Sequence, residues 1–220
     1  MTELTERTQV RRHPERGVYE RAAIDAILDE ALFCHVGFVE DGQPFVIPTI
    51  HARAGDTLYL HGSPASRMLR ELSGGIDVCA TATLLDGIVL ARSVYNHSLN
   101  YRSAVVFGRA HTVDEREGKL AALAAIVEHI VPGRGREARA PSDKELAGTV
   151  VLALPIGEAS AKVRTGPPKD FDADVDLPIW AGVIPLRLVA GQPETEARVP
   201  HAVAVPPYAA GYRRPGSMRA

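Results

Sequence analysis

Turn signals divide the middle of the chain into short apolar segments. Asp41-Gly42 and Gly55-Asp56 are pairs that readily supply the positive φ angles of tight hairpin turns, and Asp86-Gly87 is a further candidate. The segments predicted as strands are residues 31–40, 43–52, 57–62, 76–92, 100–113 and 150–156. Short strands joined by such turns predict an antiparallel sheet.

Helical spacing interrupts this strand pattern in four places. The segments predicted as helices are residues 19–30, 64–72, 115–130 and 143–146. In the third of them, Leu120, Leu123, Ile126, Val127 and Ile130 recur on one face. Strands with inserted helices predict a mainly β fold, a small β-barrel, rather than a doubly wound parallel sheet.

The chain has 220 residues, which is enough for one well-packed core. We predict a single domain over residues 21–189, preceded by a polar N-terminal arm, residues 1–20. Residues 190–220 contain five prolines and no periodicity, so we expect an extended or disordered C-terminal tail.

Composition excludes several classes of partner. The formal net charge of −2 lacks the basic surplus of nucleic-acid-binding proteins. Every apolar run is too short to span a membrane, and the N-terminus lacks the apolar core of a signal peptide. We therefore expect a cytoplasmic protein that binds neither nucleic acid nor membrane. Cys34 and Cys79 lie in apolar segments without metal-site spacing, so we expect both to be reduced.

The segment from Ser63 to Arg67 has the features of an anion-binding helix start. Ser63 is a typical N-cap, Pro64 suits the first helical position, and Ser66 and Arg67 follow in the first turn. Free backbone N–H groups and the positive end of the helix dipole attract phosphate at such a position. The alternative is a cap that serves only the helix itself.

Six fragments in the same order resemble a known family. They are PERGVYERAAIDAILDEA, VIPT, YLHGSPASR, NYRSAVVFGRA, ASAKVRTGPP and LPIWAGVIPL, between about residue 12 and residue 188. The chain resembles the flavin-nucleotide-binding proteins related to pyridoxamine 5′-phosphate oxidase, which share the FMN-binding split β-barrel. The resemblance implies FMN as the cofactor and a homodimer with the cofactor at the subunit interface.

The same resemblance assigns cofactor-binding residues to several parts of the chain. It assigns the phosphate of the cofactor to the strand-to-helix segment. It assigns the isoalloxazine ring to a preceding strand, to the NYRS motif and to the WAGV motif. The residues are Ile47, Pro48, Thr49, His61, Gly62, Ser63, Ser66, Arg67, Tyr101, Ser103, Lys162 and Trp180. The resemblance implies that Trp180 contacts the ring across the dimer interface; without the motif match, we would expect it in the core.

Two departures separate the chain from true pyridoxamine phosphate oxidases. Those enzymes usually carry Ser-Arg-Lys at the phosphate helix, whereas Met68 follows Arg67 here, with Arg70 or Lys162 as candidate replacements for the lysine. Those enzymes also have an Arg/His-rich stretch after their Trp-x-Gly, of which only Arg187 remains. The chain is therefore not expected to oxidise pyridoxamine phosphate.

Histidines raise two further hypotheses. His35, His51 and His61 fall on successive predicted strands, but strand histidines more often pack or face solvent, and no carboxylate accompanies them, so we predict no metal site. Related nitroimidazole-resistance proteins carry a functional histidine in a similar Tyr-x-His segment, which makes His61 the one catalytic candidate. Its alternative role is a hydrogen bond beside the flavin phosphate or ribityl chain. Lys162 and Arg164 fit a phosphate site and a surface strand end equally.

The function predicted from sequence is that of an FMN-binding, flavin-dependent oxidoreductase acting on a small organic substrate. A flavin carries the redox chemistry itself, which agrees with the lack of a Ser-His-Asp arrangement or a paired-carboxylate motif. Two alternatives remain: a non-catalytic carrier of flavin or haem, and a nitroimidazole-reductase-like resistance protein.

Overall fold

The structure is a computed structural model that describes residues 4–214; residues 1–3 and 215–220, the ends of the predicted arm and tail, lie outside the described part. The strands are β1 (Gly17–Val18), β2 (Phe33–Glu40), β3 (Gln43–Ala54), β4 (Thr57–Gly62), β5 (Asp77–Leu90), β6 (Ser98–Arg109), β7 (His111–Thr112), β8 (Val150–Pro155), β9 (Glu158–Arg164) and β10 (Gly182–Pro185). The α-helices are α1 (Arg21–Glu30), α2 (Arg67–Ser73), α3 (Arg116–Ile130), α4 (Asp143–Ala147) and α5 (Pro207–Ala210), and the 3-10 helices are η1 (Pro14–Arg16), η2 (Val94–Asn96), η3 (Arg134–Arg136) and η4 (Asp172–Asp174).

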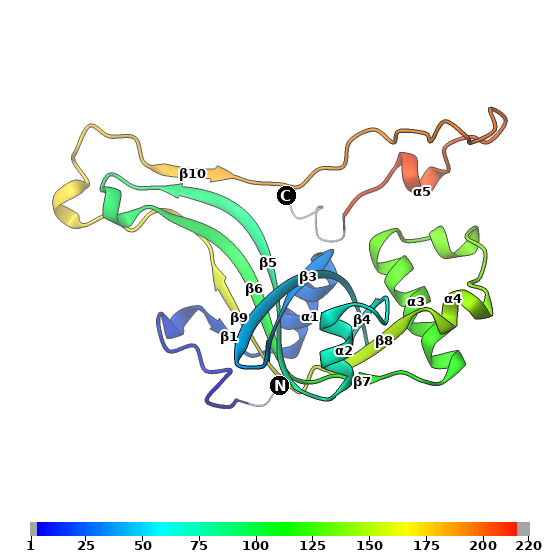
Figure 1. The fold of residues 1–220 in the computed structure, drawn as a ribbon. Coiled ribbons are helices and arrows are strands. Elements are labelled where there is room, and N and C mark those ends of the chain that lie inside the picture. Colours follow the sequence, from blue (N-terminus) through cyan, green and yellow to red (C-terminus); the bar gives the residue numbers. More distant parts are fainter. Residues whose placement is uncertain (1–3, 215–220) are drawn as a thin grey trace.

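The strands form one antiparallel sheet that bends around a shared interior (Figure 1). Their order is β1-β9-β6-β5-β2-β3-β4-β8-β7, and β10 adds to the far part of β5. β8 and β9 stand near opposite ends of this order, yet only Ile156 and Gly157 separate them in the chain. The sheet therefore curves back on itself, and the predicted mainly β architecture with inserted helices is confirmed.

Alternation along the strands divides the residues between the core and the outer face. Cys34, Val36 and Phe38 of β2 are buried on the core side, where Leu58 and Leu60 of β4 join them. α1 and α2 cover this core with fully buried aliphatic side chains. Each such side chain contributes about 1.5–3 kcal/mol, which explains why the helices pack here rather than on the outer face.

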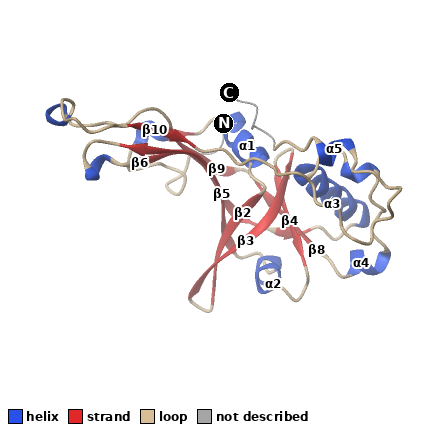
Figure 2. Ribbon diagram, turned by 90° about the horizontal axis from the view of Figure 1, so that it is seen from above, coloured by secondary structure: helices blue, strands red, loops and turns tan. Residues whose placement is uncertain are grey.

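The far parts of β5 and β6, together with β10, extend beyond the body (Figures 1 and 2). We call residues 86–100 and 167–185 the extension. The predicted turn at Asp86-Gly87 is wrong: β5 runs straight through these residues, with only a bulge between Leu85 and Gly87. The strand continues because β6 and β10 supply hydrogen-bonding partners on both of its sides.

The N-terminal segment lies against the sheet rather than free of it. The side chains of Thr5 and Arg7 both bind the carboxylate of Glu158, and β1 pairs with β9. After β10 the chain has no further strand within the described residues and returns across the body (Figure 1). There the hydroxyl of Tyr208 donates to Glu137 at 2.6 Å. Among residues 4–214 no helix is long and apolar enough to cross a membrane.

Candidate functional site

The helix start predicted after β4 exists, but its N-cap is three residues later than the sequence indicated. The N–H of Ser66 donates to the carbonyl of Ser63 at 2.9 Å, which makes residues 63–66 a β-turn with Pro64 at its second position. Ser63 is therefore not the N-cap and Pro64 is not helical, because proline suits this turn position as well as a helix start. Ser66 is the N-cap, and its side chain makes no capping hydrogen bond.

Arg67 is positioned at this helix start by two neighbours on the β2–β3 hairpin. Its Nε lies 3.3 Å from a carboxylate oxygen of Glu40, and its guanidinium stacks over the ring of Phe45 at 4.6 Å. Arg70 also contacts Glu40, at 3.5 Å. Met68, the position of the missing lysine, is buried in the core, so a cation there would lose its hydration. The helix start thus offers N–H groups that no residue within 4–214 accepts from, and an arginine that Glu40 partly neutralises.

The predicted ring-contacting residues of β3 point to different sides of the sheet. Ile47 packs against the core, whereas Pro48 is exposed on the outer face. Thr49 is half-buried, on the same side as Ile47. Of the three side chains only that of Pro48 can meet a ligand lying on the outer face.

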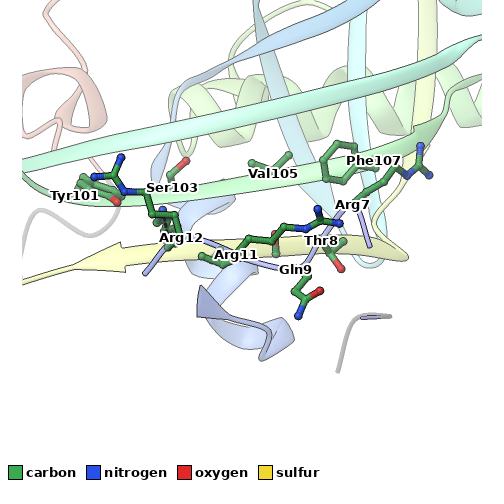
Figure 3. Close-up of a pocket in the computed structure, with 13 residues that line it drawn as sticks. Arg7, Thr8, Gln9, Arg11, Arg12, Tyr101, Ser103, Val105 and Phe107 are labelled. Atoms are coloured by element: carbon green, nitrogen blue, oxygen red, sulfur yellow. Dashed lines mark hydrogen bonds between the residues drawn. The ribbon is translucent and has the colours of Figure 1, made fainter. Parts of the chain in front are cut away.

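The outer face of β6 and β9 carries a pocket of about 300 Å³, closed on one side by residues 7–12 (Figure 3). Tyr101, Ser103 and Lys162 line it. Ser103 and Lys162 are cross-strand neighbours, and the hydroxyl of Thr83 donates to that of Ser103 at 3.2 Å. Three of the predicted cofactor-binding residues therefore come together in one pocket.

Positive charge surrounds this pocket. Lys162 donates from Nζ to the carbonyl of Arg12 at 3.0 Å, and Arg7 is paired with Glu158. Arg11 and Arg12 also line the pocket, and neither forms an ion pair with any residue in the described range. Their guanidinium groups remain available for an anionic ligand.

The three strand histidines occupy separate environments. His35 is exposed on the outer face, while His51 is fully buried and donates from Nε2 to the carbonyl of Leu28 at 2.9 Å. Burial lowers the pKa of His51 to about 4. Desolvation also lowers the pKa of His61, whose Nδ1 is buried without a hydrogen-bond partner in the described part of the chain. No group of three metal-ligating side chains occurs within residues 4–214.

His61 and Gly62 end β4 on opposite sides. A Cβ at Gly62 would lie 2.9 Å from the side chain of Leu69, so β4 approaches α2 closely at this point. His61 faces away from that contact by strand alternation. Trp180 is far from both: it precedes β10 on the extension, its ring stands against Gly182, and 66% of it is exposed. A tryptophan this exposed is not a core residue of one chain.

A family comparison gives these features a context. The family model for pyridoxamine 5′-phosphate oxidase matches residues 20–163, which is more than half of the chain. The chain belongs to the pyridoxamine 5′-phosphate oxidase family. The resemblance noted from the sequence fragments is thereby confirmed.

Similar solved structures support the assignment of the fold. The flavocytochrome Anf3 from Azotobacter vinelandii is 41% identical, with a TM-score of 0.90 and coverage of 95% of this chain and 97% of that chain. The FAD and heme binding protein from Mycobacterium smegmatis is 38% identical, with a TM-score of 0.86 and coverage of 89% and 96%. A proposed 5-nitroimidazole antibiotic resistance protein from Bacteroides thetaiotaomicron is 27% identical, with a TM-score of 0.56 and coverage of 67% and 86%. A search of curated proteins finds no match.

The candidate residues of this pyridoxamine 5′-phosphate oxidase family member form two groups. Ser66 and Arg67 lie at the helix that covers the core side, and Tyr101, Ser103 and Lys162 lie on the outer face. A third element, the arginine-bearing segment 7–12, was missed as a site component by sequence reasoning. Its signal was the density of arginines before the first helix, which reads equally well as a solvated arm.

Proposed function

We propose that this protein is a homodimeric redox protein that binds a flavin nucleotide and a haem. The observation that carries the proposal is the cationic pocket on the outer face, in a chain about 40% identical to a flavocytochrome and to an FAD and heme binding protein. The enzymatic activity that we propose is that of a flavin-dependent oxidoreductase acting on a small organic substrate. Oxidation of pyridoxamine phosphate is not proposed, because Met68 is buried where those enzymes carry a lysine.

The residues present fit a flavin nucleotide. Its phosphate needs cations or free N–H groups, which Arg11, Arg12 and the start of α2 offer. Its ring needs a flat apolar surface with a few polar groups, and Val105 and Phe107 provide apolar walls beside the hydroxyl of Ser103. When bound, the flavin supplies hydride and single-electron transfer and the haem supplies one-electron and O₂ chemistry.

The division of the candidate residues between two faces supports the homodimer. The pocket lies on the outer face, whereas α2 packs against the core, so we expect a flavin in the pocket of one chain to meet the start of α2 of another. A second copy can bring that helix start, or Trp180, to the pocket. FAD is favoured over the FMN expected from sequence, because the M. smegmatis relative is an FAD and heme binding protein and because the cationic segment 7–12 suits a diphosphate.

The test is the chromophore of the purified protein. We expect a yellow-red sample with flavin absorption and a Soret band, whose heat-released flavin runs as FAD in chromatography and whose colour bleaches with NAD(P)H and recovers in air. If heat releases FMN instead, FMN becomes the assigned flavin in place of FAD. A sample that none of the reductants bleaches would identify a non-catalytic carrier. A protein that takes up neither FMN nor FAD from solution would refute the proposed function.

A further inference from the structure

The end of the extension exposes far more apolar surface than a folded chain normally leaves in water. Val94 is 92% exposed and Tyr95 is 82% exposed, and the ring of Tyr95 stacks on that of Phe171 at a centroid distance of 6.2 Å. Leu99 and Val175 of the extension are exposed as well. Large apolar side chains left in water in this way indicate a binding surface.

One histidine at this place has the hydrogen-bonding pattern of a metal ligand. His97 places Nδ1 2.9 Å from the carbonyl of Ser93. A carbonyl only accepts, so Nδ1 carries a proton, which leaves Nε2 as the ring nitrogen that can bind a metal. The imidazole of His97 is exposed. A backbone carbonyl that fixes the tautomer in this way is the usual support of a ligating histidine.

The other histidines with assigned partners do not offer this arrangement. His51 and His129 both use Nε2 to donate to carbonyl groups at the end of α1, at 2.9 Å and 2.8 Å. His13 contacts Glu15 through Nδ1. Among the described residues, His97 alone has Nδ1 on a backbone carbonyl and an exposed Nε2.

A hydrogen bond orders the turn that carries His97. The hydroxyl of Ser93 accepts from the N–H of Tyr95 at 3.2 Å. This turn places an exposed imidazole and an exposed aromatic ring in one short segment, which suits a large apolar ligand.

We propose that His97 is an axial ligand of the haem iron, with Tyr95 and Phe171 supplying apolar contacts to the macrocycle. A porphyrin requires one or two axial donors and apolar contacts to its ring, and His97, Tyr95 and Phe171 are groups of these kinds. Leu99 continues the outward-facing row of Tyr101 and Ser103 along β6, so the haem and the pocket would share one face of the same strand. The inference rests on the haem binding of the proposed function.

The experiment titrates hemin into haem-free wild-type protein and three variants, His97→Ala, His97→Gly and His111→Ala. His111 is the matched control, because it is also an exposed histidine but lies on β7, at the end of the strand order away from the extension. We expect wild type and His111→Ala to bind one haem per chain with the same Soret spectrum. His97→Ala should bind haem at least tenfold more weakly with a shifted Soret band, and free imidazole should restore the wild-type spectrum in His97→Gly. Flavin content should stay the same in all four proteins.

Three results would overturn the assignment. A wild-type spectrum in His97→Ala would exclude His97 as the ligand while leaving haem binding intact. Loss of the spectrum only in His111→Ala would move the iron to β7, at the end of the strand order. Failure of the wild type to bind hemin would refute both this inference and the haem half of the proposed function, and the flavin half would stand on its own measurement.

Discussion

His51 is a titratable side chain that the fold holds in its neutral form. It is fully buried, and its Nε2–H donates to the carbonyl of Leu28 at the end of α1. His129 donates to the carbonyl of Ala31 in the same way, and the two rings lie 5.1 Å apart. Protonation of His51 would place a charge in the core beside a second imidazole. Its contribution to stability therefore depends on pH.

Acidification should destabilise the protein through His51. Burial lowers its pKa from an ordinary value near 6.5 to about 4, so the unfolded chain binds more protons than the native chain between these values. The free energy of unfolding then falls as the pH drops from about 6.5 to about 4, by about 3 kcal/mol in total for this group. Urea denaturation at a series of pH values measures the effect.

His51→Gln is the control for this prediction. Glutamine retains an N–H donor near the position of Nε2 but does not titrate. The variant should be somewhat less stable at pH 7, and its free energy of unfolding should vary less steeply between pH 6.5 and pH 4. Parallel pH profiles for the two proteins would show that His51 is not responsible.

Side-chain chemistry made part of the site predictable. Tyr101 and Ser103 alternate on one strand, so they were expected to share a face, and the structure places both in the pocket wall. The neighbouring Arg102 faces the other way, toward Glu30 and Asp86. The contribution of Arg11 and Arg12 was not predictable, because a segment without periodicity gives no indication of the surface it lies on.

Among the elements, α2 allows the most specific test of cofactor binding. Substituting Ser66→Ala and Arg67→Ala together should weaken flavin binding by about 10- to 100-fold, since a hydrogen bond to a charged group contributes about 1.5–3 kcal/mol. Fold and dimer should persist, because Arg67 is half-exposed and outside the core. Fluorescence titration with FAD and FMN measures the affinity.

Arg116→Ala provides the matched control for α2. Arg116 is the first residue of α3, as Arg67 is of α2, and its guanidinium also pairs with a carboxylate, that of Asp143 at 3.0 Å. Flavin affinity should not change in this variant. Stoichiometric flavin in the Ser66→Ala/Arg67→Ala protein would remove α2 from the site and leave the outer-face pocket as the only anion-binding candidate.

Element boundaries were predictable where the turn signal in the sequence agrees with the strand pairing on either side of it. Asp41-Gly42 forms the expected hairpin turn, with φ angles of 50° and 76°. Asp86-Gly87 has the same residue types but lies within β5, because pairing with β6 and β10 outweighs the local turn preference. Such pairing involves residues far apart in the chain, and no local window contains it.

At the scale of the molecule, the outer face of β2 and β3 resembles half of an interface. Val46 is 67% exposed and Ile50 is 41% exposed, and Phe33 lies directly across from Ile50 in the register. Apolar residues from adjacent strands thus form a continuous surface. In the proposed homodimer a second copy covers it.

Introducing charge on this surface should separate the subunits. Two carboxylates in Val46→Asp/Ile50→Asp would have to be desolvated on association, which costs several kcal/mol per buried charge. We expect wild type to run as a dimer in light scattering and the variant as a monomer that has lost flavin, since one chain alone leaves α2 and the pocket on opposite faces. Val189→Asp, the same kind of change at a 79% exposed position in the C-terminal segment, should leave the dimer intact. A monomeric wild type that retains its flavin would show that a single chain completes the site, and the division of candidate residues between two faces would then need a different explanation.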